Sequence, residues 1–138
     1  MSLDVGDAKI GTAMSDPMRV IATPLGIITR RDDFEAIRDI TELVKEHQVS
    51  TVVVGLPLDK DGNDSEQAKK IRQFTENLKK LVEVPVVYWN ESFSTQAAQQ
   101  MMRENSGKKR ITGEDDDAVA AAIILQEYLD ATMHINLN

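Results

Sequence analysis

The chain has 138 residues, with 16 Lys and Arg against 23 Asp and Glu, so its formal charge at pH 7 is −7. Its hydrophobic fraction of 41% is that of a folded protein, and its length predicts one domain over residues 1–138. The absence of cysteine excludes disulfides, thiolate nucleophiles and cysteine zinc sites, and favours a cytoplasmic location. The acidic balance argues against a protein that coats nucleic acid with a uniformly basic surface, and the longest apolar run, 118–125, is too short to span a membrane.

The first thirty residues predict three short strands joined by turns. Apolar runs at 3–5 and 10–14 flank Gly6 and Asp7, which are turn formers. The third run, 20–29, is interrupted by Pro24 and Gly26, which suits an edge or bulged strand better than a central one. The chain is therefore expected to begin with an antiparallel meander.

Helical spacing of apolar residues begins after Asp32 and recurs later in the chain. The predicted helices cover 32–47, 65–82, 94–104 and 117–130, and a polar loop is expected over 105–116. Apolar runs rich in β-branched residues at 50–55 and 85–89 predict two parallel strands reached by helical crossovers. The polar run 59–63 has its glycine out of register for a calcium loop and predicts a turn.

These elements together predict an α/β fold. Its core would be a mixed five-stranded sheet, made of an antiparallel three-stranded meander plus two parallel crossover strands, flanked by helices.

Four acidic residues stand where a carboxylate can do chemistry. Asp4 lies inside the first, central strand, where an ionised carboxylate is costly unless a cation or a donor meets it. Glu91 follows the last parallel strand, at the edge where open α/β sheets bind ligands, and Asp116 and Asp117 begin the last helix. Because next-but-one strands lie about 10 Å apart, long acidic side chains can converge there on one or two Mg²⁺ ions.

Each of these residues also has a structural interpretation. Asp4 could accept hydrogen bonds from turn amides, and Asp117 could complement the helix dipole, as the acids at 114–116 most simply do. His47 lies at a helix end and His134 in the tail, so neither indicates a catalytic triad or a metal pair. The basic cluster at 108–110 can contact a phosphate backbone or be a solvated loop.

Many segments together resemble the YqgF/RuvX family, whose members are described as Holliday-junction resolvases and as nucleases that mature the precursor of 16S ribosomal RNA. The matching segments keep the order and spacing of the family over nearly the whole chain. They are 3–6, 10–11, 15–16, 53–58, 61–62, 67–68, 85–86, 91, 94–95, 117, 120–121, 124–126 and 129–130. The resemblance implies a ribonuclease H-like fold and an acidic triad of Asp4, Glu91 and Asp117 that is catalytic and holds Mg²⁺ or Mn²⁺.

The chain departs from the family pattern in two places. Residues 90–93 read Asn-Glu-Ser-Phe where the family usually has Asp-Glu-Arg-Leu, which removes an acid and an arginine beside the predicted site. Fewer residues precede Asp4 than in relatives, so we expect the natural start to lie upstream of Met1.

The leading hypothesis is a metal-dependent endonuclease that hydrolyses phosphodiester bonds in precursor 16S ribosomal RNA or in branched DNA junctions. Lys108, Lys109 and Arg110 would hold the nucleic-acid backbone, and ribosome-assembly particles are the expected partners. The alternative is a non-catalytic nucleic-acid-binding or ribosome-assembly module with the same fold, which Asn90 and Ser92 favour. A kinase-like phosphotransferase also carries an Asp-x-Gly hairpin, but it would need a second domain to enclose ATP.

Overall fold

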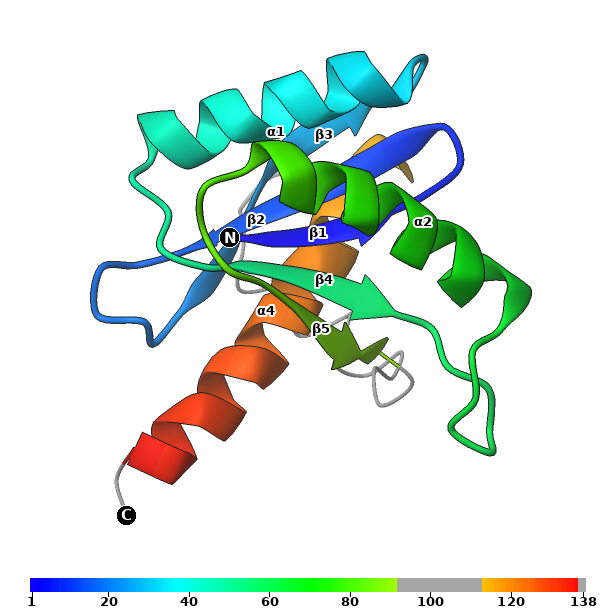
Figure 1. The fold of residues 1–138 in the computed structure, drawn as a ribbon. Coiled ribbons are helices and arrows are strands. Elements are labelled where there is room, and N and C mark those ends of the chain that lie inside the picture. Colours follow the sequence, from blue (N-terminus) through cyan, green and yellow to red (C-terminus); the bar gives the residue numbers. More distant parts are fainter. Residues whose placement is uncertain (92–112, 137–138) are drawn as a thin grey trace.

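The computed structural model describes residues 1–91 and 113–136, and their side chains except at 113–115 and 133–136. Five strands form one mixed sheet in the order β3-β2-β1-β4-β5 (Figure 1). They are β1 (Ser2–Val5), β2 (Lys9–Ser15), β3 (Ala22–Thr29), β4 (Val52–Leu56) and β5 (Val86–Asn90). β1 pairs antiparallel with β2 and parallel with β4, which in turn pairs parallel with β5. The predicted meander plus two crossover strands is therefore confirmed, with β1 at the centre.

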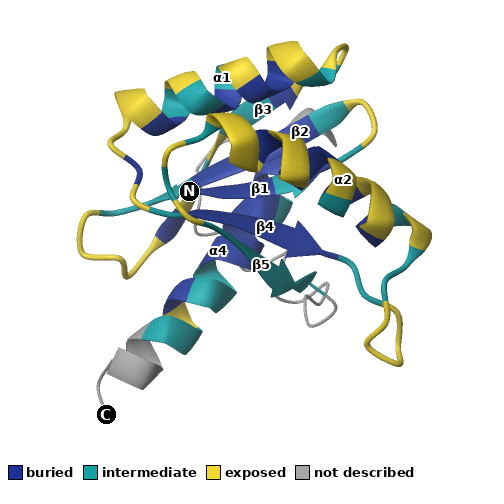
Figure 2. Cartoon of the chain, viewed as in Figure 1, coloured by how far each residue is buried: buried dark blue, intermediate teal, exposed yellow. Residues whose placement is uncertain are grey.

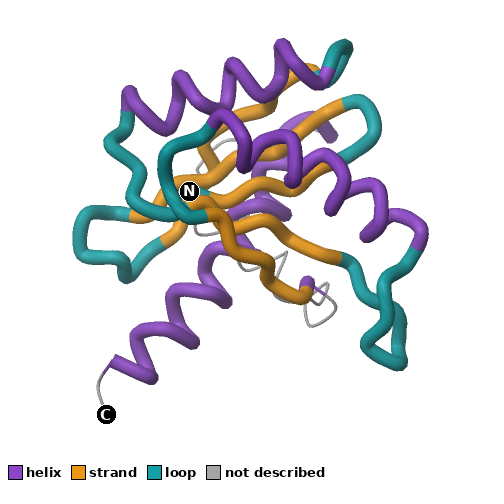
Figure 3. The backbone as a smooth tube through the Cα atoms, in the orientation of Figure 1, coloured by secondary structure: helices purple, strands orange, loops and turns teal. Residues whose placement is uncertain are grey.

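Three described helices cover the two faces of the sheet. α1 (Asp33–Glu46) and α2 (Glu66–Leu81) lie on one face, and α4 (Gly113–Asn136) crosses the other face (Figures 1 and 3). Each of the first two helices is started by a side-chain cap, because Asp32 accepts from the amide of Phe34 and Ser65 accepts from the amide of Ala68. The arrangement is a sheet between two helical layers.

β3 lies at the edge of the sheet, as Pro24 and Gly26 within it predicted. The register of the β2–β3 pair shifts between Thr12 and Ala13, so that Ala13 lies opposite Pro24. β3 begins at Ala22, two residues later than predicted, because Asp16 accepts from the amides of Val20 and Ile21 and holds them in the preceding turn. The edge position tolerates a residue that cannot donate a hydrogen bond.

The polar run after β4 forms the predicted turn. Oδ1 of Asp59 accepts from the amides of Asp61 and Asn63 at 2.9 Å each. Gly62 has a φ of +83°, a conformation that glycine adopts at little cost.

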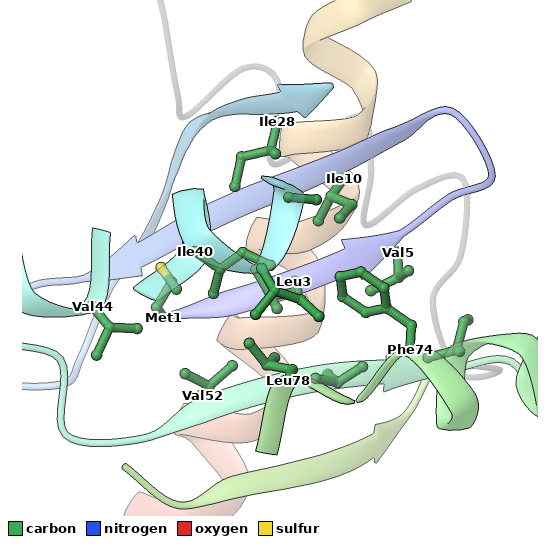
Figure 4. Packing of buried hydrophobic residues seen from close by; sticks show 14 of the residues in the cluster. Met1, Leu3, Val5, Ile10, Ile28, Ile40, Val44, Val52, Phe74 and Leu78 are labelled. Carbon is green, nitrogen blue, oxygen red and sulfur yellow. The ribbon is translucent and has the colours of Figure 1, made fainter. Parts of the chain in front are cut away.

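The larger hydrophobic core lies between the sheet and helices α1 and α2. It is made of large aliphatic side chains and Phe74, including Leu3 and Val5 from β1 (Figure 4). The helix surfaces that face away from it are exposed, whereas the central strands are buried (Figure 2). Because side chains alternate along a strand, Ser2 and Asp4 of β1 lie on the opposite face, toward α4.

The prediction for the end of the chain was wrong at both ends of the last helix. Residues 113–116, expected in a loop, form the first turn of α4, and the helix runs to Asn136 rather than ending at Asp130. Acidic residues in a first turn stabilise a helix through its dipole, so the acids at 114–116 extend it backwards. At the other end Thr132 donates to the carbonyl of Tyr128, which satisfies its hydroxyl inside the helix. The predicted helix at 94–104 lies outside the described residues.

Candidate active site

Asp4 occupies the centre of the sheet on the side that α4 covers. On the same side of β1, Ser2 is buried and its hydroxyl donates to the carbonyl of Ala121, which ties the strand to the helix. α4 is tied to the start of β3 as well, because the side-chain amide of Gln126 accepts from Ala22 and donates to the carbonyl of Val20 at 2.9 Å each. The helix is therefore fixed across the face that carries Asp4.

A glycine brings Asp117 to this face. Gly11 of β2 lies directly opposite Asp4 in the register of the two strands. A Cβ atom at Gly11 would overlap the backbone carbonyl of Asp117 and lie 2.9 Å from the amide nitrogen of Ala118. α4 can therefore pack with its backbone on β2 only because residue 11 has no side chain, and this close packing sets Asp117 beside Asp4.

A second glycine leaves room for Glu91. β4 pairs with β1 through Leu3 and Val54, so Gly55 follows on the side of β1 away from Gly11. A Cβ atom at Gly55 would overlap the end of the Ile124 side chain and lie 3.1 Å from Oε2 of Glu91. The carboxylate of Glu91 therefore lies over the bare backbone of β4, the strand between β5 and β1.

The electrostatics of Asp4 confirm that it is enclosed with another acid. Burial, and after it the negative charge of Asp117, together raise the pKa of Asp4 from 3.8 to about 6. The protein therefore keeps a central carboxylate where its ionised form is disfavoured.

Glu91 is perturbed in the same way. Burial is again the largest cause that raises its pKa, from 4.5 to about 7, followed by the charges of Asp4 and Glu127. Glu127 is held on α4 by the indole nitrogen of Trp89, which donates to its Oε2 at 3.2 Å, and the Trp89 ring packs edge-on against Tyr128. Asp4 is thus coupled to acids on two sides, Asp117 from α4 and Glu91 from the end of β5.

Carboxylate oxygens are the donors that hard divalent cations such as Mg²⁺ and Mn²⁺ take. Negative charges that lie close together in a partly buried site repel one another, and a bound cation offsets this repulsion. The donor chemistry of the site therefore fits such an ion. The acids are coupled in pairs, and among the described side chains no group of three or more His, Cys, Asp or Glu is arranged as a ready metal-binding cluster.

The structure brings the three predicted acids together in pairs, whereas the two glycines were missed. The only signal for Gly11 and Gly55 was a glycine inside an apolar strand, which often marks a close backbone approach. Glu127 was missed because nothing in the sequence pairs it with Trp89. His47 caps the end of α1, as its expected structural role requires. His134 and the basic cluster of Lys108, Lys109 and Arg110 lie outside the side chains that the structure describes.

The chain is similar to proteins that are named as nucleases and resolvases. A family profile described as "RuvX: Holliday junction resolvase" matches residues 1–131. A Roseiflexus sp. protein named "Putative pre-16S rRNA nuclease" is 40% identical over 131 residues, 95% of this chain and 93% of its own length. A protein of the same name from Dehalococcoides mccartyi is 43% identical over 128 residues, 93% of this chain and 95% of its own.

Solved structures show the same fold at low sequence identity. The Thermus thermophilus RuvC structure has a TM-score of 0.61 at 14% identity and covers 96% of this chain and 94% of its own. RuvC of the same organism in complex with a Holliday junction substrate has a TM-score of 0.62 at 16% identity, covering 95% of this chain and 93% of its own. These likenesses confirm the ribonuclease H-like fold.

No helix within the described residues is long and apolar enough to cross a membrane. The family profile covers almost the entire chain, and two relatives that match over nearly their full length are 40% and 43% identical to it. The chain belongs to the RuvX family.

Proposed function

We propose that this chain is a divalent-metal-dependent endonuclease in which Asp4, Glu91 and Asp117 form the catalytic, metal-binding site. The observation that carries the proposal is the pairwise coupling of partly buried acids around Asp4, at the centre of a sheet that gains no stability from the charge. Precursor 16S ribosomal RNA is the first substrate class, because the relatives bear that name, and branched DNA is the second, because the family description names it.

Asp4, Glu91 and Asp117 would hold Mg²⁺ or Mn²⁺. When bound, such an ion activates a water for in-line attack on the phosphorus and stabilises the departing oxygen. The chain's own residues set this up by keeping the carboxylates partly dry. Ser2 and Gln126 fix α4 against the sheet, and Gly11 and Gly55 let the acids approach one another. Lys108, Lys109 and Arg110 would position the nucleic-acid backbone.

Residues 1–138 would act as one domain in the cytoplasm, on RNA held in ribosome-assembly particles. The formal charge of −7 supports a partner that is already held in a larger particle, since an acidic protein gains little from non-specific attraction to nucleic acid.

Cleavage assays with three single variants test the proposal. The full chain is incubated with a precursor 16S RNA fragment or a four-way DNA junction, with Mn²⁺ present, and the products are separated on denaturing gels. Asp4→Asn, Glu91→Gln and Asp117→Asn should each lower the rate at least a hundredfold, because each removes one anionic oxygen ligand.

Glu42→Gln is the matched control, since it makes the same change on the exposed surface of α1. Cleavage that survives in all three site variants at the rate of the control would refute the assignment of the site.

A non-catalytic RNA-binding module is the second candidate, and the observation that favours it is Asn90, which ends β5 where the family usually has an acid. Tight binding of either nucleic acid, with no cleavage by the wild type under Mg²⁺ or Mn²⁺, would establish this function instead.

A further inference from the structure

The two helices on the same face of the sheet carry opposite charge. α1 has five acidic and two basic residues, a formal charge of −3, whereas α2 has two acidic and five basic residues, a formal charge of +3. The protein as a whole has a charge of −7, so the positive charge of α2 runs against the overall balance. A segregation of this kind creates a local positive potential on one helix.

Two lysines and two amide side chains follow one line along the outer surface of α2. Lys69, Gln73, Asn77 and Lys80 follow one another at helical spacing on the side opposite the buried residues, and all four are exposed. Lys69 and Lys80 are separated by about 16 Å along the helix axis, at 1.5 Å per residue. One strand of a nucleic-acid duplex carries about five phosphates over that length. We call these four residues the α2 ridge.

Two further cations flank the α2 ridge and pack on Tyr88 of β5, on the side of the sheet that α1 and α2 cover. The guanidinium carbon of Arg72 and the ammonium of Lys79 lie 4.8 Å and 5.1 Å from the ring centroid of Tyr88. Arg72 is also held by Asp64 through contacts of 2.7 Å and 3.1 Å. Tyr88 belongs to β5, the edge strand that leads into Glu91, and lies about 10 Å from Glu91 along the chain. The cations are thus fixed over the strand that ends at the site.

The acidic residues on α2 do not cancel the positive charge of this surface. Lys69 pairs with Glu66, and Lys79 pairs with Glu76, each at 3.2 Å between neighbouring turns. The Lys69 side chain remains 62% exposed and that of Glu66 88% exposed. Exposed pairs of this kind contribute little free energy, so a phosphate can replace the carboxylate as the partner of the lysine.

We propose that the α2 ridge, with Arg72 and Lys79 at its flank, binds the sugar–phosphate backbone of the substrate beyond the bond that is cleaved. The charge of the surface, its length and its connection to β5 all match a polyanion. Gln73 and Asn77 add donors that can bind phosphate oxygens between the two lysines. This inference rests on the proposed function, because it takes a nucleic acid as the substrate.

Binding measurements with a matched pair of double variants test the inference. Lys69→Gln with Lys80→Gln removes two charges from the α2 ridge, and Arg38→Gln with Lys45→Gln removes two charges from exposed positions on α1. Affinity of the full chain for a precursor 16S RNA fragment and for a four-way DNA junction is measured from 50 to 200 mM salt, with EDTA present so that nothing is cleaved.

The ridge variant should bind about tenfold or more weakly than wild type at the lowest salt. The slope of log affinity against log salt should be shallower by about 1 for each lysine removed. The α1 variant should leave that slope unchanged. A loss of affinity for both nucleic acids would show a backbone contact common to them. A loss of affinity for one alone would identify which of them the α2 ridge binds.

Equal affinities and equal salt slopes of the two double variants for both nucleic acids would overturn the inference. This outcome is distinct from failure of the proposed function, because binding is measured without metal or catalysis. A wild type that cleaves while the ridge variant binds and cleaves normally would leave the nuclease intact and remove the α2 ridge from its substrate contacts.

Discussion

The two faces of the sheet are built from different residues. Among the residues that the structure describes, the cluster under α1 and α2 has seventeen buried residues, of which two are alanine. The cluster under α4 has eight described buried residues, of which four are alanine, and it lies beside two glycines against which α4 or Glu91 packs. One face therefore gains stability from large apolar side chains, whereas the other brings a helix close enough to gather carboxylates.

The difference shows where stability is given up for chemistry. Asp4 occupies a strand position that an apolar side chain could fill, and its raised pKa shows that its charge is unfavourable there. The face under α1 and α2 has to supply the free energy that the face under α4 does not. Mutations on the two faces should consequently differ in kind.

The largest effect is expected on the face under α1 and α2. Phe74 is 1% exposed, and Phe74→Ala should lower the free energy of unfolding by about 3–5 kcal/mol through lost burial and a new cavity. Urea denaturation measures the loss. The pKa of Asp4, followed by NMR in the folded variant, should stay near its wild-type value, and a large change there would show that the two faces are not independent.

Gly11→Ala should cost about 3 kcal/mol, because the new methyl group meets the α4 backbone at Asp117, which cannot yield as a side chain can. Gly26→Ala is the control, since a Cβ atom at Gly26 would have nothing within 4 Å, and it should change stability by less than about 1 kcal/mol. Equal melting curves for the two variants would contradict the close packing of α4.

Asp4→Asn should stabilise the protein at neutral pH without metal, by about 1–3 kcal/mol. The pKa of Asp4 is about 6 in the folded protein against 3.8 unfolded, so the folded state binds more protons between these values. The free energy of unfolding therefore falls as pH rises through this window. Urea titrations at pH 4 and pH 8 should show a smaller fall in Asp4→Asn than in wild type. The same fall in both would disprove the raised pKa.

Gly55→Ala should have the smallest effect, about 1 kcal/mol, because its methyl group meets the flexible end of Ile124. Adding Ile124→Val, which removes that end, should restore stability, while the carboxylate of Glu91 stays displaced by the same methyl group. If the double variant recovers both stability and the wild-type pKa of Glu91, the space that Gly55 leaves over β4 is not what positions the acid.

The sequence was sufficient to predict the sheet, because its strands follow local patterns, whereas the catalytic role of the three acids stays a prediction. Period-2 and helical spacing predicted the strands and the first two helices, and Pro24 correctly marked an edge strand. The extent of α4 was missed because the apolar pattern used to predict it stops at Asp130, before the helix ends. The roles of Gly11 and Gly55 depend on Asp117 and Ile124, far away in the chain, which no local pattern shows.

Metal-dependent stability is the most direct test of the claim that the face under α4 exists to hold a cation. The free energy of unfolding of wild type and Asp4→Asn is measured at pH 7.5 with Mn²⁺ varied from zero to millimolar. Wild type should gain stability as Mn²⁺ rises, because an ion that binds only the folded state shifts the equilibrium toward it, whereas Asp4→Asn should gain little. No gain in wild type, or an equal gain in both proteins, would contradict the account.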